Sequence, residues 1–277
     1  MNILKTVAGK TVKWVFLLFF FAVAVLPLVW LFLTSFKTEA EFISYPLSMP
    51  AAWQFQNYID AVSVAKMHIL FMNSVVIASF ATLLNLLITS MAAFVISREI
   101  FFLRNSISNV IVAGVLMPIV AFMVPYLTLI RTLGLYDTRM ALVLTYAAIN
   151  IPISFFLIKS FMISIPKDLE DAAIIDGCNF SQRYSKVVLP LSRSGLVTAG
   201  TLTFIWSWNE FIYALLLTSS SKVRTIQLGI SFFTTQFRSN YPAMYAAIVL
   251  AMIPSVLVYV FFHDKIISGL TAGAVKG

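Results

Sequence analysis

Long apolar runs separated by short polar segments dominate the chain. A helix that crosses a bilayer needs about 20 predominantly apolar residues, and six stretches reach that length. They lack the strict alternation of a half-buried strand, and lipid offers no hydrogen-bond partners to an open sheet. The pattern therefore predicts six spanning helices, at approximately Trp14–Phe36, Ile69–Ile96, Ser108–Leu133, Met140–Ile163, Leu196–Leu217 and Ala243–Phe262.

Prolines interrupt several of these runs and predict local bends. Each of them removes a backbone N–H from an otherwise continuous helical pattern, but a neighbouring helix or a cavity can satisfy the freed carbonyl. We expect most of these bends to serve packing, with a role in gating as the alternative. The prolines concerned are Pro27, Pro118, Pro125, Pro152 and Pro254.

Composition supports a membrane protein and excludes other classes. Of the 277 residues, 60% are hydrophobic and 11% are charged, whereas soluble domains carry about 25% charged residues. The net charge of +8 comes from cations spread over the short segments between the runs, so nucleic-acid binding is not expected. The single cysteine, Cys178, excludes an intrachain disulfide and a cysteine-rich metal site.

The positions of lysine and arginine predict the orientation in the membrane. With the N-terminus in the cytoplasm, twelve of the 19 cations lie inside and seven outside. The first run is longer than the core of a secretory signal, about 7–15 residues, and we interpret it as an uncleaved span. The expected organisation is a cytoplasmic N-terminus at 1–13, a six-helix membrane domain at 14–263 and a cytoplasmic tail at 264–277.

The inner loop, defined as residues 164–194 between the fourth and fifth runs, predicts two short helices. Pro166 suits the first turn of the first helix, and the helix dipole favours the acids that follow it. Gly177 fits the left-handed residue that ends this helix. Asn179, with Gln182 three residues later, predicts a capping box at the start of the second helix.

The same loop has the features of a docking element. Leu169, Ala172 and Ala173 recur at helical spacing and predict an apolar face on the first helix, and Pro190 is expected to end the second. Helices that lie on lipid carry mainly lysine and arginine on their polar face, whereas four acids and four bases are mixed here. A protein partner is therefore favoured. The charged residues are Asp168, Glu170, Asp171, Asp176, Lys167, Arg183, Lys186 and Arg193.

The spacing in the inner loop resembles the EAA motif of the permease subunits of bacterial ABC importers. That motif is Glu-Ala-Ala, three residues, glycine, nine residues, then Ile-x-Leu-Pro. Aspartate replaces glutamate and valine replaces isoleucine in this chain, but every spacing is kept, by Asp171-Ala172-Ala173, Gly177, Val187, Leu189 and Pro190. Further resemblances are Asn73-Ser74, Leu133-Gly134-Leu135 with Asp137-Thr138, Trp208-Asn209-Glu210-Phe211, and a C-terminus similar to that of maltose-type (MalG-like) carbohydrate permeases, Gly269–Gly277.

This resemblance implies an all-α membrane protein of six transmembrane helices, with a cytoplasmic coupling-helix loop between spans 4 and 5. It implies a location in the bacterial inner membrane with both termini cytoplasmic. The motif residues, together with Asp176, would dock on two copies of a separate ABC ATPase that holds the ATP and magnesium. This chain would itself be no enzyme and hold no cofactor or metal. Membrane lipid, a second homologous permease and an extracytoplasmic solute-binding protein are the other implied partners.

The cargo implied by the resemblance is a carbohydrate, with an oligosaccharide favoured. Candidate residues of its pathway are the polar and aromatic side chains Asn150, Trp206, Trp208, Asn209 and Glu210, each of which could instead bond a neighbouring helix. An ABC permease for another solute, such as glycerol phosphate, is one alternative. An ion-gradient-driven secondary transporter is disfavoured, because the spans hold one carboxylate and no visible repeat. The sequence has no P-loop, HExxH or GxSxG, so ATP hydrolysis is expected on another chain.

Overall fold

The computed structural model describes residues 2–63, 66–231 and 240–274, and every regular element within these ranges is a helix. Three of these helices are long and apolar enough to cross a membrane, and three bent pairs raise the number to six if each pair is one span. The all-helical membrane fold predicted from the sequence is therefore confirmed. The chain forms two compact units, Met1–Met67 with Ile230–Met252, and His68–Gly229 with Ile253–Gly277.

The first unit contains α1 (Asn2–Thr34), α2 (Glu39–Ser44), α3 (Gln56–Ser63) and the first part of α16 (Tyr241–Ala274). The ring of Trp30 on α1 packs edge-on against Tyr245 on α16, with 5.4 Å between ring centroids. Just after α1, the fully buried Lys37 donates from Nζ to the carbonyl oxygens of Tyr45 and Pro46, at 2.9 and 3.0 Å. These carbonyls satisfy the ammonium group that burial has removed from water.

The predicted terminal segments are largely helical. α1 already begins at Asn2, so residues 2–13 of the predicted N-terminal segment belong to the first helix. α16 continues to Ala274 and takes in most of the segment predicted as a tail at 264–277. The membrane helices thus extend beyond their apolar runs.

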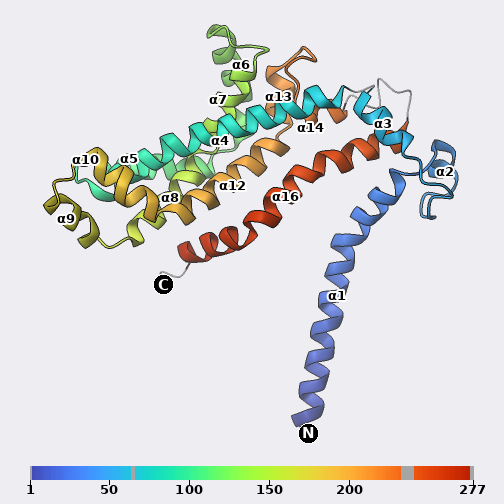
Figure 1. Ribbon diagram of the computed structural model, residues 1–277, viewed down its shortest axis with the longest axis horizontal. Coiled ribbons are helices and arrows are strands. Elements are labelled where there is room, and N and C mark those ends of the chain that lie inside the picture. The colour runs from blue at the N-terminus through green and yellow to red at the C-terminus, as the bar shows by residue number, and fades with distance from the viewer. Residues whose placement is uncertain (1, 64–65, 232–239, 275–277) are drawn as a thin grey trace. The chain divides into compact units, whose positions relative to one another are not determined.

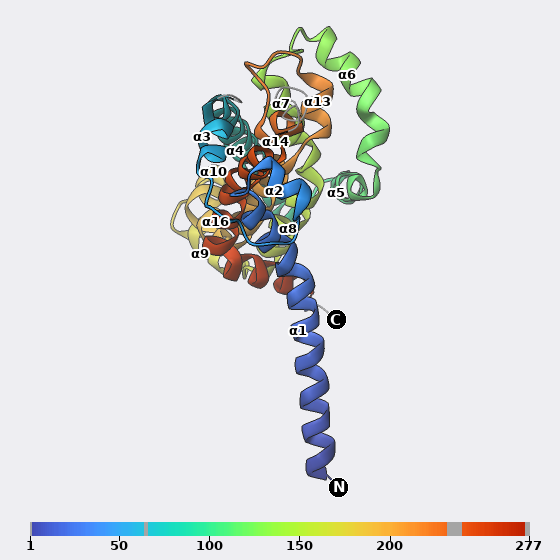
Figure 2. The same ribbon diagram turned by 90° about the vertical axis from the view of Figure 1, so that its right-hand side faces the viewer.

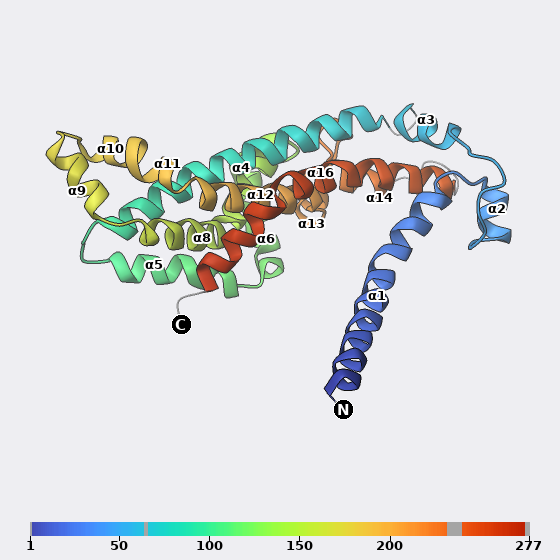
Figure 3. The ribbon, with the colours of Figure 1, turned by 60° about the horizontal axis from the view of Figure 1, so that its bottom comes forward.

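The second unit holds the inner loop and the helices around it. Its elements are α4 (Met67–Arg98), α5 (Arg104–Ala113), η1 (Gly114–Leu116), η2 (Ile119–Phe122), α6 (Met123–Thr132), α7 (Arg139–Ile149), α8 (Ile151–Ser164), α9 (Asp168–Ile175), α10 (Phe180–Gln182), η3 (Arg183–Val188), α11 (Leu189–Leu191), α12 (Arg193–Asn209) and α13 (Ile212–Leu217); α14 (Ile226–Ser231) follows at its boundary. Figures 1 and 3 show α4, α8 and α12 side by side, with α9 and α10 at one end.

Small side chains let these helices approach closely. A Cβ atom added to Gly195 on α12 would lie 2.6 Å from the ring of Phe161 on α8. Polar side chains join the helices as well, since Asn85 on α4 donates to the carbonyl of Ala147 at 2.9 Å. Helices in membranes commonly associate in this way, because lipid tails leave little hydrophobic drive for it.

Several predicted spans are broken rather than straight. The chain turns by 101° between α5 with η1 and η2 with α6, where Pro118 precedes η2 (Figure 2). α7 and α8 meet at 49° around Asn150, with Pro152 in the first turn of α8. The predicted fifth span is interrupted at Glu210, between α12 and α13. Pro27 and Pro254, in contrast, lie inside continuous helices.

Candidate functional site

The first helix of the inner loop, α9, ends as the sequence predicts. Gly177 has a φ of +80°, the left-handed region that glycine enters without steric penalty. Its N–H donates to the carbonyl of Ile174 at 3.0 Å, and the N–H of Cys178 donates to that of Ala173 at 2.9 Å. This pair of bonds satisfies two carbonyls at the end of the helix. Pro166 lies just outside α9, which starts at Asp168.

The second helix starts as predicted but ends differently. Asn179 and Gln182 form the expected capping box, with both side chain-to-backbone bonds at 2.9 Å. The helix then widens into the π-helical η3 and continues through Pro190 in α11. It bends by 75° into α12 after Ser192 rather than ending at Pro190. Pro190 stands at the start of a new helical segment, where a missing N–H breaks no bond.

The apolar face expected on α9 is divided between two sides of the helix. Ala173 is buried, together with Glu170, whereas Leu169 and Ala172 point outward. Ile175 follows them three residues later and is 86% exposed. We call Leu169, Ala172 and Ile175 the exposed face of α9. The exposed acids Asp171 and Asp176 flank it. Of the other predicted docking residues, Gly177 and Pro190 are exposed, whereas Val187 and Leu189 are half-buried.

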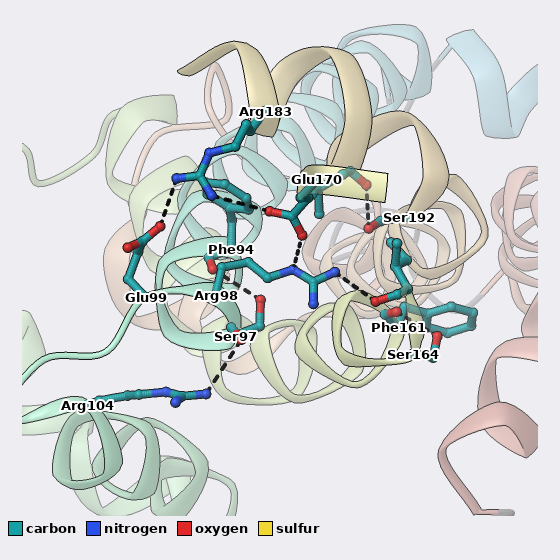
Figure 4. A network of polar contacts seen from close by, with 12 residues as sticks. Phe94, Ser97, Arg98, Glu99, Arg104, Phe161, Ser164, Glu170, Arg183 and Ser192 are labelled. Carbon is teal, nitrogen blue, oxygen red and sulfur yellow. Dashed lines mark hydrogen bonds and ion pairs between the residues drawn. The ribbon is translucent and has the colours of Figure 1, made fainter. Parts of the chain in front are cut away.

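Glu170 is the centre of a buried ion-pair network that sequence reasoning missed (Figure 4). It is 3% exposed, and its Oε1 lies 2.5 Å from Arg98 Nε at the end of α4. The N–H direction does not suit a hydrogen bond, so this contact is an ion pair by proximity. Arg183 contacts both glutamates. Its guanidinium lies 3.7 Å from Oε2 of Glu170 and 3.0 Å from Oε1 of Glu99. Arg98 also donates to the carbonyl of Ile165 at 3.1 Å.

Aromatic packing holds the second loop helix to the same part of α4. The ring of Phe94, which is 1% exposed, contacts the rings of Phe180 and Tyr184 at centroid distances of 5.1 and 5.3 Å. The Tyr184 hydroxyl lies 2.8 Å from that of Ser90. Ser90, Phe94 and Arg98 are spaced four residues apart and so share one face of α4. Both helices of the loop are therefore held by one stripe of one helix.

A cavity of about 770 Å³ lies where α12 and α13 meet, a size typical of small-molecule sites. Asn150, Trp206, Asn209 and Glu210, four of the five residues predicted for a solute pathway, line it. The fifth, Trp208, is 1% exposed and packs against the rings of Phe71 and Phe204 instead. Most of the remaining lining is apolar, from η1, η2, α8, α12 and α13: Gly114, Val115, Met117, Ile119, Ile149, Pro152, Ile153, Leu202, Ile205, Phe211 and Ile212.

Glu210 occupies the break between α12 and α13, where it caps α13. Its Oε1 accepts from the backbone N–H of Tyr213 at 2.7 Å, and its Oε2 accepts from that of Ala214 at 3.0 Å. Tyr146 on α7 donates its hydroxyl to Oε2 at 2.7 Å. The carboxylate thus satisfies amides that the broken helix leaves without carbonyl partners. Within the described chain, no group of three or more His, Cys, Asp or Glu residues could hold a metal ion.

The pair Asn73-Ser74 ties the opposite end of α4 to segment 222–226. Asn73 Nδ2 donates to the carbonyl oxygens of Lys222 and Arg224, both at 2.9 Å. The Ser74 hydroxyl accepts from the backbone N–H of Ile226 at 2.8 Å. These bonds explain why an amide and a hydroxyl stand in tandem in this apolar helix.

Asp137, between α6 and α7, makes a similar clamp on the segment after α13. It adopts a φ of +60°, and its Oδ1 accepts from the N–H groups of Ser219 and Ser220 at 2.8 and 3.0 Å. Partial burial opposes ionisation, but the bonds from Ser220 and Ser219 outweigh it and lower the pKa of Asp137 below its ordinary value of 3.8. A non-glycine residue at positive φ is uncommon, and aspartate is among those that tolerate it.

Comparison with known proteins connects these features to transport. Residues 85–271 match the family described as "Binding-protein-dependent transport system inner membrane component". The chain is 40% identical to the ABC transporter permease protein ORF2 of Caldicellulosiruptor sp. (strain Rt8B.4), over 97% of this chain and 98% of that protein. It is 34% identical to the trehalose/maltose transport system permease protein MalG of Thermococcus litoralis, over 92% of each chain. A crystal structure of a bacterial ABC transporter involved in the import of the acidic polysaccharide alginate contains a similar chain, with a TM-score of 0.83, 22% identity, and coverage of 92% and 95%.

Proposed function

We propose that this chain, which belongs to the family of binding-protein-dependent transport system inner membrane components, is an importer permease. It carries a carbohydrate into the cytoplasm. Its membership rests on the match over residues 85–271 and on the 40% identity to a permease over nearly the full length of both chains. The single observation that carries the proposal for the inner loop is α9, which presents an exposed apolar face while its opposite side is fixed by buried ion pairs.

The exposed face of α9 docks on a separate ATPase subunit. Leu169 and Ile175 are 47% and 86% exposed, so this chain alone leaves two large apolar side chains in contact with water. A short helix with apolar side chains at helical spacing fits a groove in a protein partner. Asp171 and Asp176 beside it supply charges for basic groups of that partner, and Gly177 lets the two backbones approach. ATP and magnesium bind to that partner, present in two copies.

The cavity at the α12–α13 break forms part of the solute pathway. Asn150 and Asn209 offer amide groups and Trp206 offers a ring, the groups that bind sugar hydroxyls and the apolar faces of sugar rings. No lysine or arginine is among its lining residues, which disfavours glycerol phosphate or another phosphorylated solute. Two similar proteins are named for trehalose/maltose transport and for alginate import, and we extend the carbohydrate class, with an oligosaccharide favoured, to this chain.

The remaining partners follow from the proposed cycle. ATP-driven closure of two ATPase subunits moves the inner loop and opens the pathway to the outside, where a solute-binding protein delivers the cargo. A second, homologous permease completes the pathway. The inner loop and both termini then lie in the cytoplasm, in agreement with the excess of lysine and arginine on that side.

Isolation of the tagged chain from its native membrane tests this function. We expect mass spectrometry to find an ABC ATPase and a second permease in stoichiometric amounts, together with vanadate-sensitive hydrolysis of Mg-ATP. Carbohydrate extracted from the solute-binding protein of the same complex would identify the cargo. Recovery of this chain alone, with uptake driven by an ion gradient, would contradict the proposal. A phosphorylated or amino-acid ligand on the binding protein would contradict only the carbohydrate assignment.

A further inference from the structure

Two adjoining cavities lie between the start of α12 and the second half of α16, both inside the second compact unit. One has a volume of about 330 Å³ and reaches α4, and the other, nearer the inner loop, has a volume of about 320 Å³. Val197 on α12 and Phe262 on α16 line both of them. We call the two cavities together the inner groove. It extends from Arg193 to Phe204 along α12 and faces Val258 to Lys265 on α16.

The larger cavity of the inner groove is apolar. Leu86 on α4, Phe204 on α12 and Val258 on α16 are typical of its described lining. The hydroxyl of Thr201, the one polar side chain among these lining residues, donates to the carbonyl of Val197 at 2.7 Å and so already has an acceptor. A polar solute would find few partners in this cavity, whereas a hydrocarbon chain would lose nothing by entering it.

The length of the inner groove matches one leaflet of a bilayer. Arg193 and Phe204 are eleven residues apart on α12, which corresponds to about 16 Å at the rise of an α-helix. Half of the hydrocarbon core of a bilayer is about 15 Å thick. A lipid with its headgroup beside Arg193 could therefore lay one acyl chain along the whole groove.

The end of the inner groove nearest the inner loop is cationic. Arg193, Ser194 and Lys265 line it, both cationic side chains are exposed, and no acid is among the described residues that line this cavity. The buried hydroxyl of Thr198 donates to the backbone carbonyl of Lys265 at 2.8 Å and thereby fixes α16 beside α12 at this point. Basic pockets between membrane helices on the cytoplasmic side bind the headgroups of anionic lipids.

We propose that the inner groove is a binding site for an anionic phospholipid. Arg193 and Lys265 bind the phosphate group, the Ser194 hydroxyl donates to it, and an acyl chain fills the apolar cavity. The outer side of α16 is suited to the same environment, since Leu257 and Val260 are 49% and 63% exposed on an apolar helix. The site goes beyond the proposed function, from which it takes only the assignment of this end of the groove to the cytoplasmic leaflet.

A lipid is favoured over a helix of a protein partner by the charge of the groove. A helix packed there would bury the two cations and would have to bring acids of its own to the same depth. A phospholipid carries its charge at the membrane surface and its apolar chain below, in the order in which the groove presents its cationic end and its apolar cavity.

Native mass spectrometry of the purified chain with its co-isolated partners tests the site. Titration with phosphatidylglycerol should show one tightly bound lipid that the double variant Arg193→Gln/Lys265→Gln loses. We expect its dissociation constant to rise about thirtyfold, because each basic residue strengthens the attraction of anionic lipid about fivefold. The matched control Arg139→Gln/Lys222→Gln removes two exposed cations from segments predicted to lie outside and should bind this lipid as wild type does.

A second pair of variants tests the apolar cavity with both cations in place. Val258→Trp fills the cavity and should release the same phosphatidylglycerol. Leu257→Trp places an equal side chain on the neighbouring, half-exposed position outside the groove and should retain the lipid. Thermal unfolding without added lipid should show similar stability for these two variants, and phosphatidylglycerol should raise the unfolding temperature only of wild type and Leu257→Trp.

Four results would overturn the lipid site. Equally tight binding of phosphatidylcholine would show that the cations do not select the lipid, and a full lipid count in Arg193→Gln/Lys265→Gln would show the same. Displacement of phosphatidylglycerol by excess inorganic phosphate would leave a phosphate site that does not use the groove. A photoreactive residue at Val258 that joins this chain to a second permease, rather than to lipid, would show that protein covers the groove.

Discussion

Two buried glutamates, one in the inner loop and one in the membrane cavity, are held in opposite ways. Glu170 is 3% exposed and faces two arginines from other elements. Glu210 is 8% exposed and accepts from two backbone amides three and four residues later, and from one tyrosine hydroxyl. The first carboxylate joins separate elements through charge, whereas the second completes a local helix end.

This difference matches the work proposed for each region. A loop that transmits force needs attachments that hold one position, and a buried ion pair fails sharply when it is displaced. A cavity wall built from a broken helix first needs its backbone satisfied, since unpaired amides are costly in a membrane. The broken helix also exposes side chains such as Asn209 to the cavity.

Glu170→Gln should give the largest loss of stability. It leaves the buried Arg98 guanidinium facing a neutral amide, and removing one partner of a buried pair costs about 3–5 kcal/mol. Thermal unfolding of the detergent-solubilised complex, followed by tryptophan fluorescence, measures this loss. The double variant Arg98→Met/Glu170→Met should recover most of it. An equally large loss in the double variant would show that shape, rather than charge pairing, holds α9.

Glu210→Ala should destabilise the protein by about 2–4 kcal/mol. It leaves the N–H groups of Tyr213 and Ala214 and the Tyr146 hydroxyl without their acceptor. Each would cost about 1–3 kcal/mol if it stayed unsatisfied, but water in the cavity that Glu210 lines can replace part of the lost bonding. Glu210→Gln keeps one carbonyl acceptor and should lose roughly half as much. The same unfolding assay checks this order. Equal losses for the two variants would show that charge is essential here too and would remove the contrast with Glu170.

Asp137→Ala should cost about 1–2 kcal/mol, because it removes an acceptor of two amide bonds at a more exposed site. The folded-state pKa of Asp137 lies below its ordinary value of 3.8, so the contribution is fully present above that pH. It is lost as the pH falls through the lower folded-state pKa. The stability difference between wild type and variant should therefore shrink only below about pH 3.8. A difference that already shrinks near neutral pH would contradict this assignment.

Gly177→Asp should change stability least, by about 1 kcal/mol, because a side chain at a φ of +80° is strained. Aspartate tolerates positive φ better than most residues, and no atom lies within 4 Å of a Cβ built there. Its charge and bulk would nevertheless obstruct the seat of α9, so co-purification of the ATPase and uptake should be lost while the protein stays inserted. Gly177→Ala is the small control. Normal uptake by Gly177→Asp would contradict the docking proposal.

Local signals in the sequence predicted local structure well. The left-handed Gly177 and the capping box of Asn179 and Gln182 depend on residues within one helical turn of each other, and both are confirmed. The inward face of α9 was not predictable in this way. Leu169 and Ala172 look like core positions, but Glu170 turns inward because Arg98, 72 positions earlier, lies beside it, and no local pattern reveals such a partner.

The cavity shows the same limit. Asn150, Trp206, Asn209 and Glu210 stand out in the sequence as polar or aromatic residues in apolar runs, and the folded chain gathers these four around one space. Trp208 met the same criterion but is buried against Phe71. The break at Glu210 carried no proline or glycine, so the sequence predicted one straight span where the structure has α12 and α13.

Site-specific photo-crosslinking from the exposed face of α9 tests the central claim most directly. A photoreactive residue at Ile175, which is 86% exposed, should join this chain to the ATPase subunit when the intact complex is irradiated. The same residue at Leu83, exposed in the middle of α4, should give no such product. Absence of an ATPase product from Ile175 in a complex that hydrolyses ATP, or an equal product from Leu83, would contradict the assignment of α9 as the element that couples this permease to its ATPase.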